Sequence, residues 1–269
     1  MSNKKRQHFV PQCYLKSWTI KNELYSLSKR NGIPRKQPTK TIAKRNHLYT
    51  LPSVLFENSE TRNFELQELI TENLIFKIWE DRWPNVLNGI KENKLTKDQI
   101  RDLKGFIITQ SFRTPKFLRL NKERVERLEM PSENIDDVYH FAVLGIDGLT
   151  NFIKNCVCEI IQCNDISNFI TSDNPATHWI QDGEIFHHLN GIALNNNLFK
   201  NPNYKILCPL DPKHFGILSP NLGIDISDIS KNLVSRRIID NDTVKQLNQM
   251  VEHGADKMLF AKNLNDYIP

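Results

Sequence analysis

The chain has 269 residues, of which 39% are hydrophobic and 25% are charged. This ordinary globular composition excludes a fibrous or disordered chain, and the length allows one large domain or two small ones. The net charge of +5 is unevenly placed, because residues 1–50 hold 12 Lys or Arg and a single acidic residue, Glu23. Such a segment favours an anionic partner (nucleic acid, a nucleotide or the acidic remainder of the chain), with a solvated basic arm as the simpler alternative.

The sequence carries no signal for a membrane or for secretion. No apolar run approaches the roughly 18 residues that a membrane-spanning helix needs. The basic start of the chain is not followed by a continuous apolar segment, so we expect no signal peptide and no membrane association. The five cysteines form no Cys-x-x-Cys pair. They argue against a disulfide framework or a zinc ribbon and predict a reducing compartment, the cytoplasm.

The first 50 residues predict a short helix followed by a β-hairpin. Residues 8–15 can open a helix, because a proline falls in its first turn. Residues 23–28 alternate between apolar and polar side chains as a strand does, and Asn31 and Gly32 supply a hairpin turn. We expect residues 40–50 to return toward the layer of this strand.

The middle of the chain predicts a helical bundle. Apolar residues recur at helical spacing over residues 61–80, and Thr96 is an N-cap in front of a further periodic stretch. Pro115 should end or kink the helix that Thr96 begins. The expected helices cover residues 61–80, 83–92, 97–114, 115–129 and 135–155.

After residue 155, short β-rich runs replace the helical period. The expected strands cover residues 157–161, 168–171, 205–208, 215–218 and 257–261. Residues 181–203 should form a long loop, and residues 241–255 a late helix. The prediction is therefore an α+β fold with an N-terminal β-hairpin, a central helical bundle and a C-terminal mixed or antiparallel sheet with a late helix.

We expect one intertwined domain over residues 1–269, since the hairpin would otherwise lack a sheet to join. Its parts would be a basic hairpin segment (1–50), a helical block (60–155) and a sheet-rich block (156–269).

Polar residues at the end of an apolar run form the most distinct motif. Ser172, Asp173 and Asn174 follow a predicted strand and precede a proline. Asp173 can serve as a general base, a metal ligand or an acceptor for a cation, and Asn174 can orient a carbonyl or a phosphate. The alternative is a turn in which these side chains cap backbone N–H groups.

Two further polar motifs contain a histidine and an arginine. His8 lies in basic surroundings that lower the pKa of an imidazole, so it can act as an acid–base group, or else make one structural hydrogen bond. Gln110 and Arg113 share a helix face, where Arg113 can hold a phosphate or pair with the acidic helix before it. On that helix, Glu72 belongs to a carboxylate stripe that can bind metal or transfer protons, although such stripes are usually solvated faces.

The other histidines, including the adjacent His187 and His188, lack metal-ligand spacing. The chain also has no glycine-rich phosphate loop and no nucleophile elbow. We assign no metal ligands from the sequence, and a divalent ion held by the carboxylates stays open as a cofactor.

These motifs resemble a known family, catalogued as domain of unknown function 4238. The resemblance covers most of the chain and implies no reaction, because the family has no established activity. The matching segments are His8-x-Val10-Pro11-x-x-Tyr14-Leu15, Gln110-x-x-Arg113-Thr114-Pro115, Ser172-Asp173-Asn174-Pro175, Pro209-Leu210 and Asn248, with Trp18 in place of a usual Phe and Ala176 in place of a common Val.

Two functions from different classes fit these residues. The first, which the residues favour, is an enzyme acting on phosphodiesters of nucleic acid or nucleotides, such as a nuclease-like toxin or defence effector. The second is a non-catalytic module that binds nucleic acid or a protein, with residues 1–50 contacting phosphates. The first assigns catalysis to His8, Glu72, Arg113 and Asp173, and substrate binding to Tyr14, Gln110, Ser172 and Asn174.

A third interpretation gives the motifs a structural role. His8, Arg113 and Asp173 would then form a buried polar network that locks the N-terminal segment onto the core. The oligomeric state stays open, and a dimer is plausible.

Overall fold

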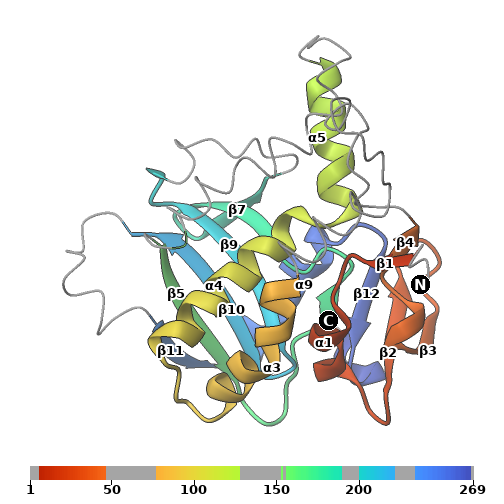
Figure 1. The fold of residues 1–269 in the computed structure, drawn as a ribbon, viewed down its shortest axis with the longest axis horizontal. Coiled ribbons are helices and arrows are strands. Elements are labelled where there is room, and N and C mark those ends of the chain that lie inside the picture. The colour runs from red at the N-terminus through yellow and green to blue at the C-terminus, as the bar shows by residue number, and fades with distance from the viewer. Residues whose placement is uncertain are drawn as a thin grey trace, which may run out of the picture.

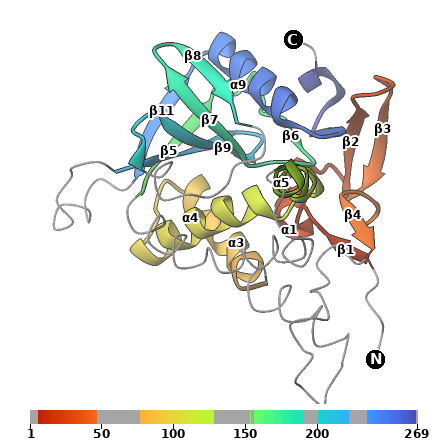
Figure 2. The same ribbon diagram turned by 90° about the horizontal axis from the view of Figure 1, so that it is seen from above.

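A computed structural model of the protein describes residues 6–46, 77–127, 153, 156–189, 200–221 and 234–267. The strands form a pair, a six-stranded sheet and a four-stranded sheet. Helices lie on both faces of the six-stranded sheet (Figures 1 and 2). The fold is α+β, with paired strands near the N-terminus, helices in the middle, and a C-terminal sheet with a late helix, as the sequence predicts.

The six-stranded sheet has the order β11-β5-β10-β9-β7-β8. Its neighbours are antiparallel except β11 and β5, which run parallel. The predicted strands at 157–161, 205–208 and 215–218 are confirmed within β5, β9 and β10. The six strands are β5 (Cys156–Cys163), β7 (Thr177–Asp182), β8 (Ile185–His188), β9 (Tyr204–Asp211), β10 (His214–Pro220) and β11 (Val234–Ile239).

The predicted loop over residues 181–203 is wrong in its first part, because β7 and β8 form a hairpin there. Gly183 occupies the turn with a φ of 60°, a left-handed conformation that glycine adopts without steric cost. The dipeptide Asp182-Gly183 is a hairpin signal hidden in a stretch rich in loop-forming residues. Residues 190–199 lie outside the described part of the chain.

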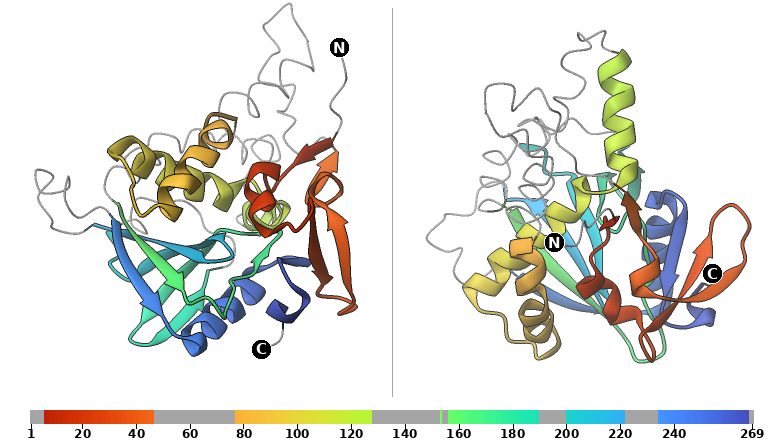
Figure 3. Two further views of the ribbon diagram at one scale, coloured as in Figure 1. Left: turned by 90° about the horizontal axis from the view of Figure 1, so that it is seen from below. Right: turned by 45° about the vertical axis from the view of Figure 1, so that its right-hand side comes forward.

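The four-stranded sheet joins segments far apart in the sequence, in the order β3-β2-β12-β6. β2 (Glu23–Ser28) and β3 (Pro34–Pro38) form the predicted hairpin, which lies at one side of the molecule (Figure 3). β12 (Met258–Ala261) pairs with β2 on one side and with β6 (Thr171–Ser172) on the other. β6 is shorter than the strand predicted at 168–171, because the Ile170 N–H bonds to a side chain, that of Asn248, instead of a strand.

The strand that returns from the hairpin turn is β3, and the prediction of residues 40–50 in this layer is wrong. After η2 (Thr39–Thr41), β4 (Lys44–Asn46) pairs instead with β1 (Arg6–His8). The short helix predicted within residues 8–15 is confirmed only over Gln12–Leu15 (α1), because His8 belongs to β1 and Pro11 is the N-cap. η1 (Lys16–Trp18) continues this helix. Residues 47–50 lie outside the described residues.

The helical block contains α3 (Lys77–Lys91), α4 (Lys97–Phe112) and α5 (Pro115–Arg127). Thr96 caps α4: its hydroxyl accepts from the Gln99 N–H, and the Gln99 side chain accepts from the Thr96 N–H. α3 runs unbroken across residues 80–83, where the sequence predicted two helices. Residues 61–76, and residues 135–155 apart from 153, lie outside the described part of the chain.

α4 packs on one face of the six-stranded sheet, and α9 (Asn241–Gly254) packs on the other (Figure 2). Side chains of β5 alternate between the two cores: Cys158 lies on the α4 side, and Ile161 lies on the α9 side. After β12, the chain ends its described course in η7 (Leu264–Tyr267). Within the described ranges, no helix is long and apolar enough to span a membrane.

Candidate functional site

Tyr14 fastens the N-terminal segment to the sheet. Its ring is fully buried, with Trp18 and Phe106 among its neighbours. Its hydroxyl donates to the Pro209 carbonyl at 2.7 Å and shares a 2.6 Å hydrogen bond with the Thr171 hydroxyl. Burial raises the pKa of Tyr14 well above its ordinary value, so the phenol stays neutral. The polar atom of Tyr14 is therefore occupied within the fold.

Arg113 connects three elements at the C-terminal end of α4. The residue is 1% exposed, and its guanidinium donates to a Glu80 carboxylate oxygen and to the His8 backbone carbonyl, both at 2.6 Å. These charge-assisted bonds tie α4 to α3 and to β1. The Glu80 contact is the salt bridge to the acidic helix that the sequence offered as the alternative to phosphate binding.

His8 is partly buried beside Arg113. The Gln12 side-chain amide donates to its Nε2 atom at 2.9 Å. Burial, helped by the positive charges of Lys44 and Arg113, lowers the pKa of His8 to about 4, against a weaker opposing effect of the Ile42 backbone. The imidazole is therefore neutral at physiological pH, which is the form that a general base requires.

Gln110 differs from the other motif residues. It lies one helical turn before Arg113 and is completely buried. Neither atom of its amide has a hydrogen-bond partner in the described part of the chain. An unpaired buried amide group costs about 1–3 kcal/mol, so native proteins rarely leave one without a reason. Glu72, the remaining predicted catalytic residue, lies outside the described residues.

Asp173 caps the turn between α9 and β12. Its Oδ1 accepts from the Asp256 N–H at 2.9 Å, and its Oδ2 accepts from the N–H groups of Lys257 at 2.8 Å and Met258 at 3.1 Å. Burial raises the pKa of Asp173 to about 6, although the three hydrogen bonds lower it. Both carboxylate oxygens are engaged by backbone groups, as in the capping role that the sequence left open.

Asn174 joins the corner between α4 and α5 to the end of α9. Its Oδ1 accepts from the Thr114 hydroxyl at 2.7 Å, and its Nδ2 donates to the Gly254 carbonyl at 2.9 Å. The Asn174 N–H donates to the Ser172 hydroxyl at 3.1 Å. The Gly254 carbonyl belongs to the last turn of a helix, where carbonyls lack intrahelical partners. Asn174 supplies one of the missing donors.

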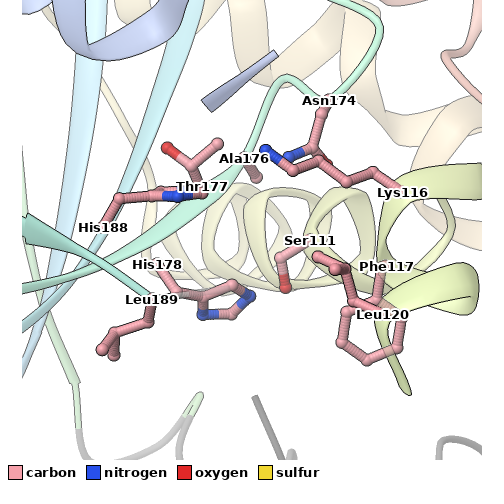
Figure 4. A pocket seen from close by; sticks show the side chains of 10 residues that line it. All are labelled: Ser111, Lys116, Phe117, Leu120, Asn174, Ala176, Thr177, His178, His188 and Leu189. Atoms are coloured by element: carbon pink, nitrogen blue, oxygen red, sulfur yellow. The ribbon is translucent and has the colours of Figure 1, made fainter. Parts of the chain in front are cut away.

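A small pocket that the sequence did not reveal lies between the motifs at residues 110–115 and 172–175 (Figure 4). Ser111 and Lys116 contribute from α4 and α5, Asn174 and His178 from the strand end and β7, and His188 from β8. The volume of this pocket is about 20 Å³, which is enough for one water molecule. Lys116 directly follows the motif that ends at Pro115, and His178 lies three residues after the motif that ends at Pro175. This closeness to the motifs is the sequence signal that could have identified both residues.

The pocket holds a neutral imidazole beside a partly buried amine. Burial lowers the pKa of His178 to about 3; the nearby His188 adds to this, and the Ser111 backbone opposes it. Its Nδ1 shares a 2.5 Å hydrogen bond with the Tyr204 hydroxyl. Burial also lowers the pKa of Lys116, which donates to the Gly254 carbonyl at 2.8 Å. The space admits one water or one small polar group and is too small for a nucleotide.

No cluster of three or more His, Cys, Asp or Glu side chains within reach of one metal ion occurs in the described ranges. The five cysteines are all free thiols. Burial raises the pKa of the partly buried Cys13 to about 12, so this thiol is not poised as a nucleophile.

Exposed basic side chains surround the β2–β3 hairpin. Lys36 lies 3.9 Å from the Glu23 carboxylate, and no other member of the set pairs with a carboxylate of the described residues. We call this set the basic surface. Its members are Lys16, Lys21, Arg30, Arg35, Lys36, Lys40 and Arg45. Lys29 is also exposed but is not counted, because its amine donates to the Glu252 and Ala255 carbonyls.

Comparison with known protein families identifies the family to which the chain belongs. Residues 6–264 match the family described as "Protein of unknown function (DUF4238)". The chain belongs to this family. No curated protein and no solved structure matches it. The resemblance inferred from the motifs is thereby confirmed.

In this DUF4238 protein the motif residues form two joints. The first joint brings His8 and Arg113 together where β1 meets the helical block. The second brings Asp173 and Asn174 to the end of α9. The chain neighbours Arg113 and Thr114 connect the two joints, because Thr114 donates to Asn174.

Proposed function

We propose that this DUF4238 protein binds nucleic acid through its basic surface. The observation that carries the proposal is the set of seven exposed Lys and Arg side chains around the hairpin, with Glu23 as the one acid between residues 6 and 46. Lysine and arginine neutralise phosphates and release condensed counterions, which is the main source of sequence-independent affinity.

The shape of the hairpin supports this proposal. β3 is an edge strand with a proline at each end, and proline disfavours pairing with a further strand. Arg35 and Lys36 are neighbours on this strand, so their side chains point to opposite faces of the hairpin. The exposed edge strand of the four-stranded sheet therefore presents cations that can contact phosphates.

In this proposal the motif residues support the hairpin segment instead of performing chemistry. Arg113 holds β1 through the His8 carbonyl, and Tyr14 holds α1 against the sheet. A surface that is already ordered before it binds loses less conformational entropy on binding. The contacts of Arg113 and Tyr14 therefore contribute to affinity without touching the ligand.

Binding is tested by fluorescence anisotropy with labelled single- and double-stranded DNA and RNA, at salt concentrations from about 50 to 200 mM. We expect affinity to fall steeply with salt. The variant Arg35→Ala/Lys36→Ala should bind more weakly and lower the salt-dependence slope by up to about 2.

The matched control is Lys91→Ala/Lys94→Ala, which removes the same charge from two exposed residues, one at the end of α3 and one in the loop before α4. It should leave the affinity and the slope unchanged. Binding that does not depend on salt, or equal losses in the two double variants, would rule out the basic surface as the interface.

Phosphodiester cleavage is the second candidate function, because His8 is held in its neutral form next to the cations Lys44 and Arg113. The protein is incubated with total RNA, tRNA and single- or double-stranded DNA, with Mg²⁺, Mn²⁺ or EDTA. Cleavage that is lost in His8→Ala would support an enzyme, and inhibition by EDTA would add a metal ion. Salt-sensitive binding without cleavage would support the binding function and exclude the nuclease function.

A further inference from the structure

A larger groove lies between α9 and the face of the six-stranded sheet. Its volume is about 690 Å³, within the range of sites that hold small molecules. Ile161, Ile217 and Leu247 form part of an apolar floor. We call this space the α9 groove. It shares only His188 with the small pocket beside Lys116.

Aromatic rings gather on the β7–β8 side of the α9 groove. The ring centroids of Trp179 and His188 are 4.8 Å apart, and the ring of His253 stands edge-on to His188 at 5.2 Å. Trp179 is 4% exposed and donates its indole N–H to the Thr177 hydroxyl, so it backs the wall. His188, His253 and Phe186 are more exposed, and they offer the rings against which a flat heteroaromatic group can stack.

A guanidinium lies on the β11 side of the groove. The Arg237 side chain is 58% exposed, and its Nε lies 3.2 Å from a Glu159 carboxylate oxygen. Within the described residues, the two terminal nitrogens of Arg237 have no hydrogen-bond partner, so they can donate as a pair to an anionic group. The amides of Gln246 and Gln249 lie between the two sides, on α9.

We propose that the α9 groove binds a nucleotide, with its base against Phe186, His188 and His253 and its phosphates directed toward Arg237. An aromatic molecule without charge would leave the two terminal nitrogens of Arg237 without a ligand contact, although its Nε still pairs with Glu159. Inorganic phosphate would leave the aromatic rings without a ligand contact. A nucleotide combines a flat ring, a hydrogen-bonding edge suited to glutamine amides and an anionic chain. The proposal is independent of nucleic-acid binding by the hairpin.

Isothermal titration calorimetry of the full chain tests this site. The probes are adenosine, AMP, ADP, ATP and inorganic phosphate, followed by the monophosphates of the other bases. We expect one saturable site per chain that prefers nucleotides to the nucleoside by at least about tenfold, with ATP bound most tightly. The rings of Phe186 and His188 and the side chain of Arg237 belong to opposite edges of the sheet, so a longer phosphate chain extends further toward Arg237. Phe186→Ala should weaken nucleoside and nucleotide alike by about tenfold.

Arg237→Gln should abolish the preference for nucleotides and leave nucleoside binding intact. The matched control is Lys245→Gln, which removes one charge from an exposed position of α9 outside the groove. Arg35→Ala/Lys36→Ala should also bind nucleotides normally, which separates this site from the basic surface. The proposal is overturned if no nucleotide binds at millimolar concentration, or if folded Phe186→Ala and Arg237→Gln proteins bind like the wild type.

Discussion

At the scale of single residues, Asp173 shows how a sequence motif with catalytic potential can be engaged by the backbone. Its three N–H donors come from positions 83 to 85 residues further along the chain. Sequence reasoning found the polar residues at the strand end because their types are distinctive. It could not choose between catalysis and capping, because nothing local to Asp173 specifies donors so far away.

Replacement of Asp173 should be costly. Asp173→Ala removes the acceptor of three N–H groups in a buried turn, so we expect the free energy of unfolding to fall by about 2–4 kcal/mol. Ser172→Ala is the neighbouring control, because it removes one acceptor and should cost about 1 kcal/mol. Urea unfolding followed by circular dichroism measures both. A loss in Asp173→Ala no larger than in Ser172→Ala would contradict the capping role.

His8 and His178 should make stability depend on pH. In the folded state the pKa is about 4 for His8 and about 3 for His178, below the ordinary 6.5. Between each folded value and pH 6.5, the folded state therefore binds fewer protons than the unfolded chain. The stability they contribute is present above pH 6.5 and is lost as the pH falls. Asp173 has the opposite sign: its contribution is present below pH 3.8 and is lost as the pH rises through about 6.

The two histidines act against the single aspartate, so the free energy of unfolding should decrease as the pH falls from 6.5 toward 4. His178→Gln should make this decrease shallower, because one of the two histidines no longer titrates. Urea unfolding at several pH values measures the slope for each protein. An unchanged slope in His178→Gln would show that His178 is not buried in its neutral form.

At the scale of elements, α3 and α4 approach each other closely at Gly105. A Cβ at this position would lie 2.5 Å from the Trp79 ring. Glycine to alanine in an exposed helix usually stabilises by up to about 1 kcal/mol. Here we expect Gly105→Ala to destabilise the protein by about 1–3 kcal/mol.

Thermal unfolding of Gly105→Ala, Trp79→Leu and the double variant measures this contact. The double variant should lose less stability than the sum of the single variants, because the smaller side chain makes room for the new methyl group. A higher melting temperature for Gly105→Ala alone would mean that the helices are further apart than described.

Elements with local end signals were predictable, and those defined by distant partners were not. The helix α4 has a capping box within four residues, and the β2–β3 turn contains an Asn-Gly dipeptide. β1 and β11 have no such signal: β1 is three residues long, and β11 gains its place by pairing with β5, more than 70 residues earlier. The β7–β8 hairpin had a local signal that the surrounding composition masked.

At the scale of the whole molecule, β12 lies between β2 and β6, so segments from both halves of the chain share one sheet. We propose on this basis that residues 1–269 form one intertwined domain. Far-ultraviolet circular dichroism and the fluorescence of the four tryptophans should then report one coincident unfolding transition. Two separate transitions would indicate two domains.

The position of β12 also bears on how the protein is made. A two-stranded hairpin is at best marginally stable in water, and β2 meets its second neighbour only about 230 residues later in the sequence. On the ribosome, the hairpin therefore emerges long before the strand that completes its sheet. The sheet that carries the basic surface would therefore be completed only near the end of translation, after slow long-range strand pairing.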